Sequence, residues 1–120
     1  MHSTVYLVIP DNAPDKNGTI QFLLEPYRRQ EHAEYQREWY YWDYWYFFNI
    51  KTGDDVLSYR DCYFLPDEVP DPSLAAAIIT PDRALHDLYS LSDLVSHEVK
   101  WNEIIDSLEN HIVVVIRIHS

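Results

Sequence analysis

The residues best suited to chemistry lie in one aromatic run. Residues 39–50 read WYYWDYWYFFNI, which is nine rings interrupted by a single aspartate, Asp43. Such a density of rings favours an extended strand over a helix. Strand alternation would then place Tyr40, Trp42, Tyr44 and Tyr46 on one face and Tyr41, Asp43, Trp45 and Phe47 on the other.

One aromatic face can enter the core, and the other needs a cover. Large aromatic patches are uncommon on monomer surfaces, so a loop of this chain, a partner chain or a ligand must cover it. Rings with polar tips suit stacking on a purine or insertion into a protein groove. We therefore expect a binding surface at Trp42, Asp43, Trp45 and Tyr46, with Arg60 and His86 as further polar contacts.

Several arginines flank the aromatic run and could add phosphate recognition. Each guanidinium is a forked donor that matches a phosphate group, and arginine beside tryptophan would favour a nucleotide ligand. The alternative is that these arginines pair with nearby glutamates on one polar face. The arginines are Arg28, Arg29, Arg37 and Arg60.

The other reactive side chains form no recognisable catalytic or metal motif. Six histidines lie in no compact ligand pattern, and the single cysteine, Cys62, has no second thiol beside it. The chain also lacks a nucleophile elbow and a glycine-rich phosphate loop. Asp82 and His86 could meet across a turn, but such pairs are more often surface contacts. We expect a non-enzymatic protein without metal or cofactor.

The charge of the chain limits its partners. Twenty acidic residues against nine basic ones give a net charge of -11, which repels nucleic acid and anionic lipid and favours a basic protein surface. The acidity could also serve only to keep a ring-rich protein soluble. Without an apparent signal peptide or an apolar stretch of membrane-spanning length, we expect a cytoplasmic protein.

The run must be positioned by a small set of elements. We expect strands over 4–9, 39–50 and 112–118, a helix from Thr19 to just before Pro26, and an amphipathic helix over 91–110. A turn at 52–55 should join the aromatic strand to residues 56–65, and a turn at 80–83 should join residues 74–79 to 84–88. This order predicts one α+β domain over 1–120: a ferredoxin-like split βαβ sandwich, with an antiparallel sheet and two helices on one face.

Several fragments, in order, resemble a family of small uncharacterised proteins from actinobacteria and their phages. The matching segments are Leu24-Glu25-Pro26-Tyr27, Trp42-Asp43-Tyr44-Trp45-Tyr46, Thr80-Pro81-Asp82 with His86, and Val113 to His119. The chain departs from the family where Phe48 to Lys51 replace a Gly-Gly-Arg-Trp segment, where Arg83 replaces a turn glycine, and where the last strand lacks Asp-Cys. The resemblance implies a phage or mobile-element origin.

Together these features predict a phage-type inhibitor of bacterial antiviral defence that works by stoichiometric binding. Its target would be a protein effector such as a CRISPR nuclease complex. One alternative is a sponge that sequesters a nucleotide immune signal. Another is a structural or assembly protein that dimerises through its aromatic strand, and a third is an enzyme that uses His86 with Asp82.

Overall fold

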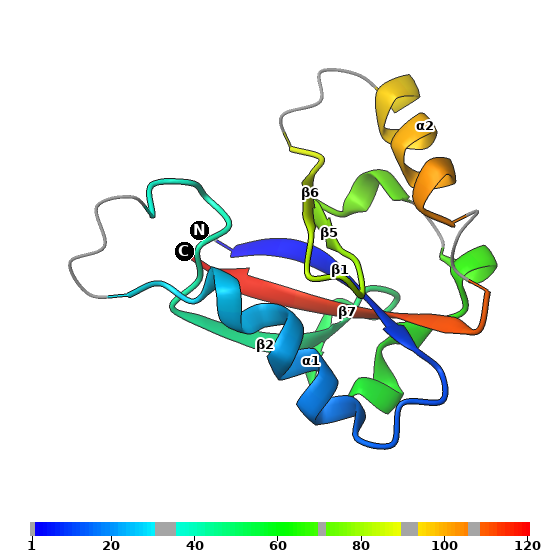
Figure 1. Cartoon of the computed structure of the whole chain (residues 1–120), viewed down its shortest axis with the longest axis horizontal. Coiled ribbons are helices and arrows are strands. Elements are labelled where there is room, and N and C mark those ends of the chain that lie inside the picture. The colour runs from blue at the N-terminus through cyan, green and yellow to red at the C-terminus, as the bar shows by residue number, and fades with distance from the viewer. Residues whose placement is uncertain (1, 31–35, 70–71, 90–93, 106–108) are drawn as a thin grey trace.

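A seven-stranded mixed sheet and two helices form a compact α+β globule (Figure 1). The computed structural model describes residues 2–30, 36–69, 72–89, 94–105 and 109–120. The strands are β1 (His2–Pro10), β2 (Tyr44–Asn49), β3 (Asp54–Val56), β4 (Tyr63–Phe64), β5 (Ala77–Ile79), β6 (Leu85–Asp87) and β7 (His111–His119). The helices are α1 (Lys16–Leu24) and α2 (Leu94–Ile105), and short 3-10 turns span Glu25–Tyr27, Tyr59–Asp61, Pro66–Glu68 and Pro72–Leu74.

Strands β1 and β7 form the centre of the sheet, and they pair antiparallel over their whole length. Their register runs from His2 opposite His119 to Pro10 opposite His111. On its other side β7 pairs with β2 near its end and with β4 near its start, while β1 pairs in parallel with β5. A strand covered on both faces reads as a continuous apolar run. The expected strand over 112–118 is confirmed for this reason.

Alternate side chains of the β1–β7 pair enter two different hydrophobic clusters. Val5 and Leu7 share one cluster with Ile20 and Leu23 of α1. Tyr6 shares the other cluster with Trp101 and Ile104 of α2, together with Val8, Val113 and Val115. Because neighbouring strand residues point to opposite faces, the two helices cover opposite faces of the sheet. Figure 1 shows α1 and α2 on either side of the central pair.

The ferredoxin-like arrangement is therefore wrong, although the α+β class is confirmed. The strand order is β3-β2-β7-β1-β5-β6, β1 and β5 run parallel, and the helices do not share a face. Hydrophobic patterning identifies a segment as a strand, but it does not choose that strand's neighbours. No helix among the described residues is long and apolar enough to cross a membrane.

The first helix begins earlier than expected. Asp15 rather than Thr19 is the N-cap, and its side chain accepts a hydrogen bond from the Gly18 amide at 3.0 Å. Aspartate is among the strongest N-cap residues, so the helix starts at Lys16 and Thr19 lies inside it. From the sequence, Ser90 or Ser92 would cap the second helix, and both lie outside the described residues.

The aromatic strand is half as long as expected. Only Tyr44–Asn49 pairs as a strand, while residues 39–41 form turns and Trp42 makes an isolated bridge to Arg28. Its neighbour β7 ends at His119, whose carbonyl accepts a hydrogen bond from the Asp43 amide at 2.9 Å. Beyond that point the run has no strand to pair with. The expected hairpin partner also divides, because β3 pairs with β2 whereas β4 pairs with β7.

The second hairpin, β5 to β6, is confirmed, and Arg83 occupies an unusual place in its turn. Its φ of 70° lies in the left-handed region, which favours glycine. Arg83 is held there by Phe22, since its guanidinium lies 4.0 Å over the ring and its Nε donates to the Phe22 carbonyl at 3.0 Å. The Tyr27 hydroxyl donates to the Arg83 carbonyl at 2.6 Å. The turn is thus tied to the end of α1.

Leu7 and Leu57 form a matched pair for testing the core. Leu7 is 0% exposed in the centre of β1, and Leu57 is 100% exposed after β3. We expect Leu7→Ala to lower the free energy of unfolding by about 2–5 kcal/mol, the usual loss for a buried leucine. Leu57→Ala should change it by less than about 0.5 kcal/mol. Urea denaturation followed by circular dichroism measures both, and equal losses would contradict the proposed core.

Cys62 should be inert in the folded protein. It is buried, and burial raises the pKa of its thiol to about 11. The reactive form of cysteine is the thiolate, which is scarce three units below the pKa. We expect an aromatic disulfide reagent at pH 8 to label Cys62 only after urea unfolds the chain. Rapid labelling without urea would show that the thiol is accessible.

Candidate functional site

Among the described residues, α2 covers only part of one sheet face. On the side where α2 lies, this helix covers the part of the β1–β7 pair around Tyr6 and Val113. The same face continues towards the chain termini with residues of β1, β2 and β7, and Figure 1 places α2 at the far end of the sheet from both termini. We call this surface the open face; it consists of His2, Tyr44, Tyr46, Arg117 and His119.

Strand register brings these five side chains together. Tyr44 lies opposite His119, which lies opposite His2, so one cross-strand row holds two imidazoles and a phenol. Tyr46 and Arg117 form the next row. Directly opposed side chains lie within contact distance across a sheet. The open face is therefore a consequence of pairing between strands that lie far apart in the sequence.

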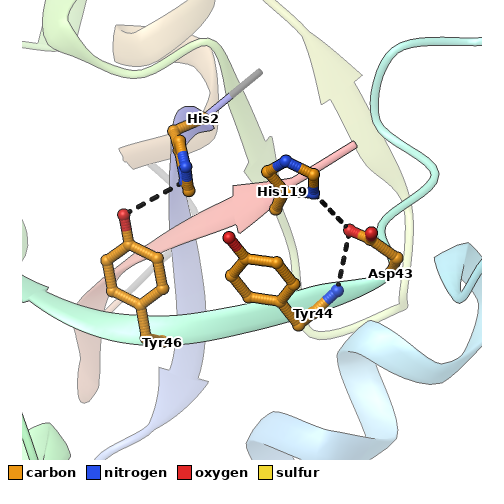
Figure 2. Close-up of polar contacts among 5 residues, drawn as sticks. All are labelled: His2, Asp43, Tyr44, Tyr46 and His119. Atoms are coloured by element: carbon orange, nitrogen blue, oxygen red, sulfur yellow. Dashed lines mark hydrogen bonds and ion pairs between the residues drawn. The ribbon is translucent and has the colours of Figure 1, made fainter.

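Asp43 orients His119 at the edge of the open face. The His119 Nδ1 lies 2.7 Å from the Asp43 Oδ1, and the same carboxylate oxygen accepts the Tyr44 amide at 3.0 Å (Figure 2). The hydrogen bond from His119 holds the pKa of Asp43 below its usual value. The Tyr44 ring stacks on His119 with 4.7 Å between centroids and 8° between planes. The imidazole is thus fixed from two directions.

His2 completes the row from the other side. Its ring centroid is 4.9 Å from that of His119, and the Tyr46 hydroxyl lies 3.2 Å from its Nδ1. Partial desolvation, followed by the charges of His119 and Arg117, lowers the pKa of His2. In the neutral tautomer that carries its proton on Nε2, the His2 Nδ1 accepts this hydrogen bond from the Tyr46 hydroxyl.

Arg117 lies in the second row, and its side chain packs against the protein itself. Its guanidinium sits 5.1 Å over the Phe48 ring, and its Nη2 lies 3.5 Å from the His2 carbonyl. Its Nε is buried and makes no hydrogen bond. This packing leaves the rings and imidazoles as the groups that the open face presents to a partner.

The arrangement places an oriented imidazole on a sheet surface. A carboxylate on Nδ1 is how a general base is oriented, since it leaves Nε2 available for a proton. Catalysis also needs a cavity that holds substrate and excludes water. Four cavities of about 180–430 Å³ are lined by described residues, and none of the four includes a residue of the open face. A flat ring-rich face fits a macromolecular partner.

The structure brings together only two of the six side chains expected to bind. Asp43 and Tyr46 lie at the open face, with Tyr44, His2 and His119 beside them. Trp45 points to the opposite side of β2, and Trp42 packs there too rather than beside Tyr44. Trp42 departs from the expected alternation because it precedes the strand.

Trp42 and Trp45 help to hold α1 in place. Trp42 Nε1 donates to the Leu24 carbonyl at 3.0 Å, and both rings line a cavity of about 180 Å³ that also includes Arg28. A nucleotide needs more space, because pockets for small ligands usually have about 300–1,000 Å³. Arg60 lies elsewhere, 5.7 Å over the Tyr59 ring, in a cavity of about 350 Å³.

His86 and Asp82 meet through Thr80 rather than directly. The Thr80 Oγ1 lies 2.5 Å from the Asp82 Oδ1 and 3.2 Å from the His86 Nε2. A hydroxyl can donate only one hydrogen bond, and Thr80 donates it to the Asp82 carboxylate, so His86 donates from its Nε2 to the Thr80 oxygen. His86 in this arrangement cannot remove the proton from Thr80. No group of three or more potential metal-ligating side chains occurs in the described ranges.

Four residues of the open face escaped the sequence reasoning. His2, Tyr44, Arg117 and His119 occupy alternate positions on three strands, but His2 and His119 lie just outside the ranges 4–9 and 112–118 that were expected as strands. The available signal was that the first and last strands both carry a histidine near a terminus. It becomes meaningful only if those two strands are antiparallel neighbours.

Trp42 and Tyr44 should separate structural rings from surface rings. Trp42→Phe removes the donor to the Leu24 carbonyl and should lower the free energy of unfolding by about 1–3 kcal/mol. Tyr44 is 48% exposed, so Tyr44→Phe should change it by less than about 0.5 kcal/mol. Denaturant titration of both variants gives the comparison. Equal stability of the two would argue against the bond from Trp42 to α1.

Comparison with known proteins provides no relative for this chain. No family model, curated protein or solved structure matches it. The resemblance to small actinobacterial and phage proteins stays a prediction, and the site is described from its own residues.

Proposed function

We propose that this protein is a non-enzymatic inhibitor of bacterial antiviral defence that acts by stoichiometric binding to a protein effector. The observation that carries the proposal is the open face, a sheet surface of tyrosine and histidine rings that α2 leaves uncovered. Tyrosine is common at protein interfaces because its rigid ring offers a large contact area and a polar tip at low entropic cost. Tyr44 and Tyr46 are the expected anchors.

The charge around the open face supports a basic protein as the partner. Asp43 lies at one margin, and the neighbouring edge strand β3 brings Asp54 and Asp55 to another. The two β3 carboxylates are exposed, and Asp55 is close enough to His2 to oppose the lowering of its pKa. An aromatic centre with an acidic margin complements a basic surface.

A nucleic-acid-binding effector offers such a surface. The groove that receives DNA or RNA in a nuclease complex is lined with lysine and arginine, and a protein with a net charge of -11 is attracted to it. The resemblance to small phage proteins supports the same class of target. A CRISPR nuclease complex is the specific form of the proposal.

The proposal can be tested with a purified CRISPR nuclease complex and its DNA target. The wild-type chain should bind the complex at a fixed stoichiometry, seen by size-exclusion chromatography with light scattering, and should reduce DNA cleavage. Tyr44→Ala should weaken binding by about 2 kcal/mol or more, the loss typical of an interface anchor. Val99→Ala, an exposed apolar truncation on α2 outside the open face, should bind as the wild type does.

Other outcomes assign the open face differently. A stable homodimer in the same experiment, dispersed by Tyr44→Ala, would favour the assembly protein. A rise of several degrees in melting temperature with a nucleotide would favour the signal sponge. Inhibition that is unchanged in Tyr44→Ala would remove the open face from the proposal.

A further inference from the structure

A separate cavity lies between the β5–β6 hairpin, α2 and the start of β7. Its volume is about 430 Å³, which is within the range of small-molecule sites. His111, one of its residues, lies on β7 roughly 27 Å from His119 and roughly 20 Å from Arg117 of the open face, at a rise of about 3.4 Å per residue. Its polar lining comprises Thr80, Asp82, His86, Lys100, Glu103 and His111.

We propose that this cavity binds a small ligand through an anionic group, a carboxylate or a phosphate, held by Lys100, His86 and His111. The three nitrogen-bearing side chains come from α2, β6 and β7, so three elements converge on one site. The site requires no protein effector and is independent of the function proposed for the open face. The lining also holds two carboxylates, Asp82 and Glu103, so the proposal depends on how these are engaged.

Each histidine keeps one ring nitrogen uncommitted. His111 Nδ1 lies 2.8 Å from the Glu109 carbonyl, so it donates there and leaves Nε2 without a hydrogen bond among the described residues. His86 donates from Nε2 to Thr80, so its Nδ1 is likewise without a hydrogen bond among the described residues. Bonds to the protein thus set the tautomer of both rings, and each ring can offer one further donor when protonated.

The carboxylates of the cavity are less available than its nitrogens. Asp82 Oδ1 accepts both the Thr80 hydroxyl and the Ala84 amide, and these bonds hold the pKa of Asp82 below its usual value. Asp82 therefore builds the turn. The Glu103 carboxylate lies 4.0 Å from the Lys100 ammonium, and the Glu103 side chain is 64% exposed. The two therefore form a weak ion pair at the rim of the cavity. An anion can replace Glu103 as the partner of Lys100.

Binding of an anion should be coupled to protonation of His86. Burial, and then the charge of Lys100, lower the pKa of His86, while Asp82 opposes them. The cavity without ligand thus favours the neutral ring at pH 7. An anion beside the ring offsets the charge of Lys100 and favours the protonated form. Affinity should therefore rise as pH falls, by at most about tenfold per pH unit for one proton taken up.

Imidazole signals in NMR spectra of the full chain test the proposal, with sodium sulfate and sodium acetate as probes. Sulfate is a tetrahedral anion of constant charge and represents phosphate, whereas acetate represents a carboxylate. At pH 6.0 and constant ionic strength, one probe should shift the His86 and His111 signals saturably and leave those of His2 and His119 unchanged. The probe that binds more tightly identifies the anionic group.

Two variants and a matched control make the result decisive. Lys100→Gln should weaken binding of the probe about tenfold or more, as expected for one lost charge-assisted bond. His86→Gln should weaken it and also reduce the pH dependence to the part that His111 contributes. Lys51→Gln removes an equal charge from an exposed turn outside the cavity and should change nothing. Unsaturable shifts with both probes, or undiminished binding in Lys100→Gln, would overturn the proposal.

Discussion

The full-length antiparallel pairing of β1 with β7 is the interaction on which the rest of the structure depends. Nine residues of each strand face one another in an unbroken register, from His2 with His119 to Pro10 with His111. Because side chains alternate across a strand, this register divides the apolar residues into two sets and requires a cover for each. Helix α1 covers one set, and α2 covers half of the other. A slip of one residue would exchange the sets and expose both clusters.

The same register explains why the polar rings gather where they do. The α2-facing side of the central pair is apolar around Tyr6 and Val113, where the helix packs, and polar from Arg117 to His119, where it does not. The residues of β2 that lie beside this polar part of the sheet are tyrosines. Tyrosine tolerates a partly exposed position because its ring is apolar and its hydroxyl is polar. The open face and the core are therefore two ends of one sheet surface.

The two proposed sites differ because their surroundings differ. At the open face, rings lie flat across neighbouring strands, and the carboxylates of Asp43, Asp54 and Asp55 lie at the margins. Such a surface is suited to a large partner that covers it. The cavity beside α2 is concave instead, and its nitrogens come from three elements. A concave site surrounds a small anion, and that shape makes local attraction effective despite the acidity of the whole chain.

The sequence by itself determined the elements, and local patterning is the reason. Continuous β-branched runs identified β1 and β7, and turn chemistry identified the β5–β6 hairpin. The same sequence predicted a binding region in the aromatic run, and two of its residues, Asp43 and Tyr46, lie at the open face. The predictions that were wrong concerned which strands and helices lie next to one another. The parallel contact of β1 with β5 and the placement of the helices on opposite faces follow from pairings that no local pattern encodes.

Only the tertiary structure decided which rings are structural and which are exposed. Trp42 was grouped with Tyr44 by strand alternation, yet it packs on the other side because the strand begins after it, where β7 first offers a partner. His2 and His119 are separated by nearly the whole chain and meet because the first and last strands are neighbours. Local preference acts over a few residues, whereas a site assembled from distant strands exists only once their register is set.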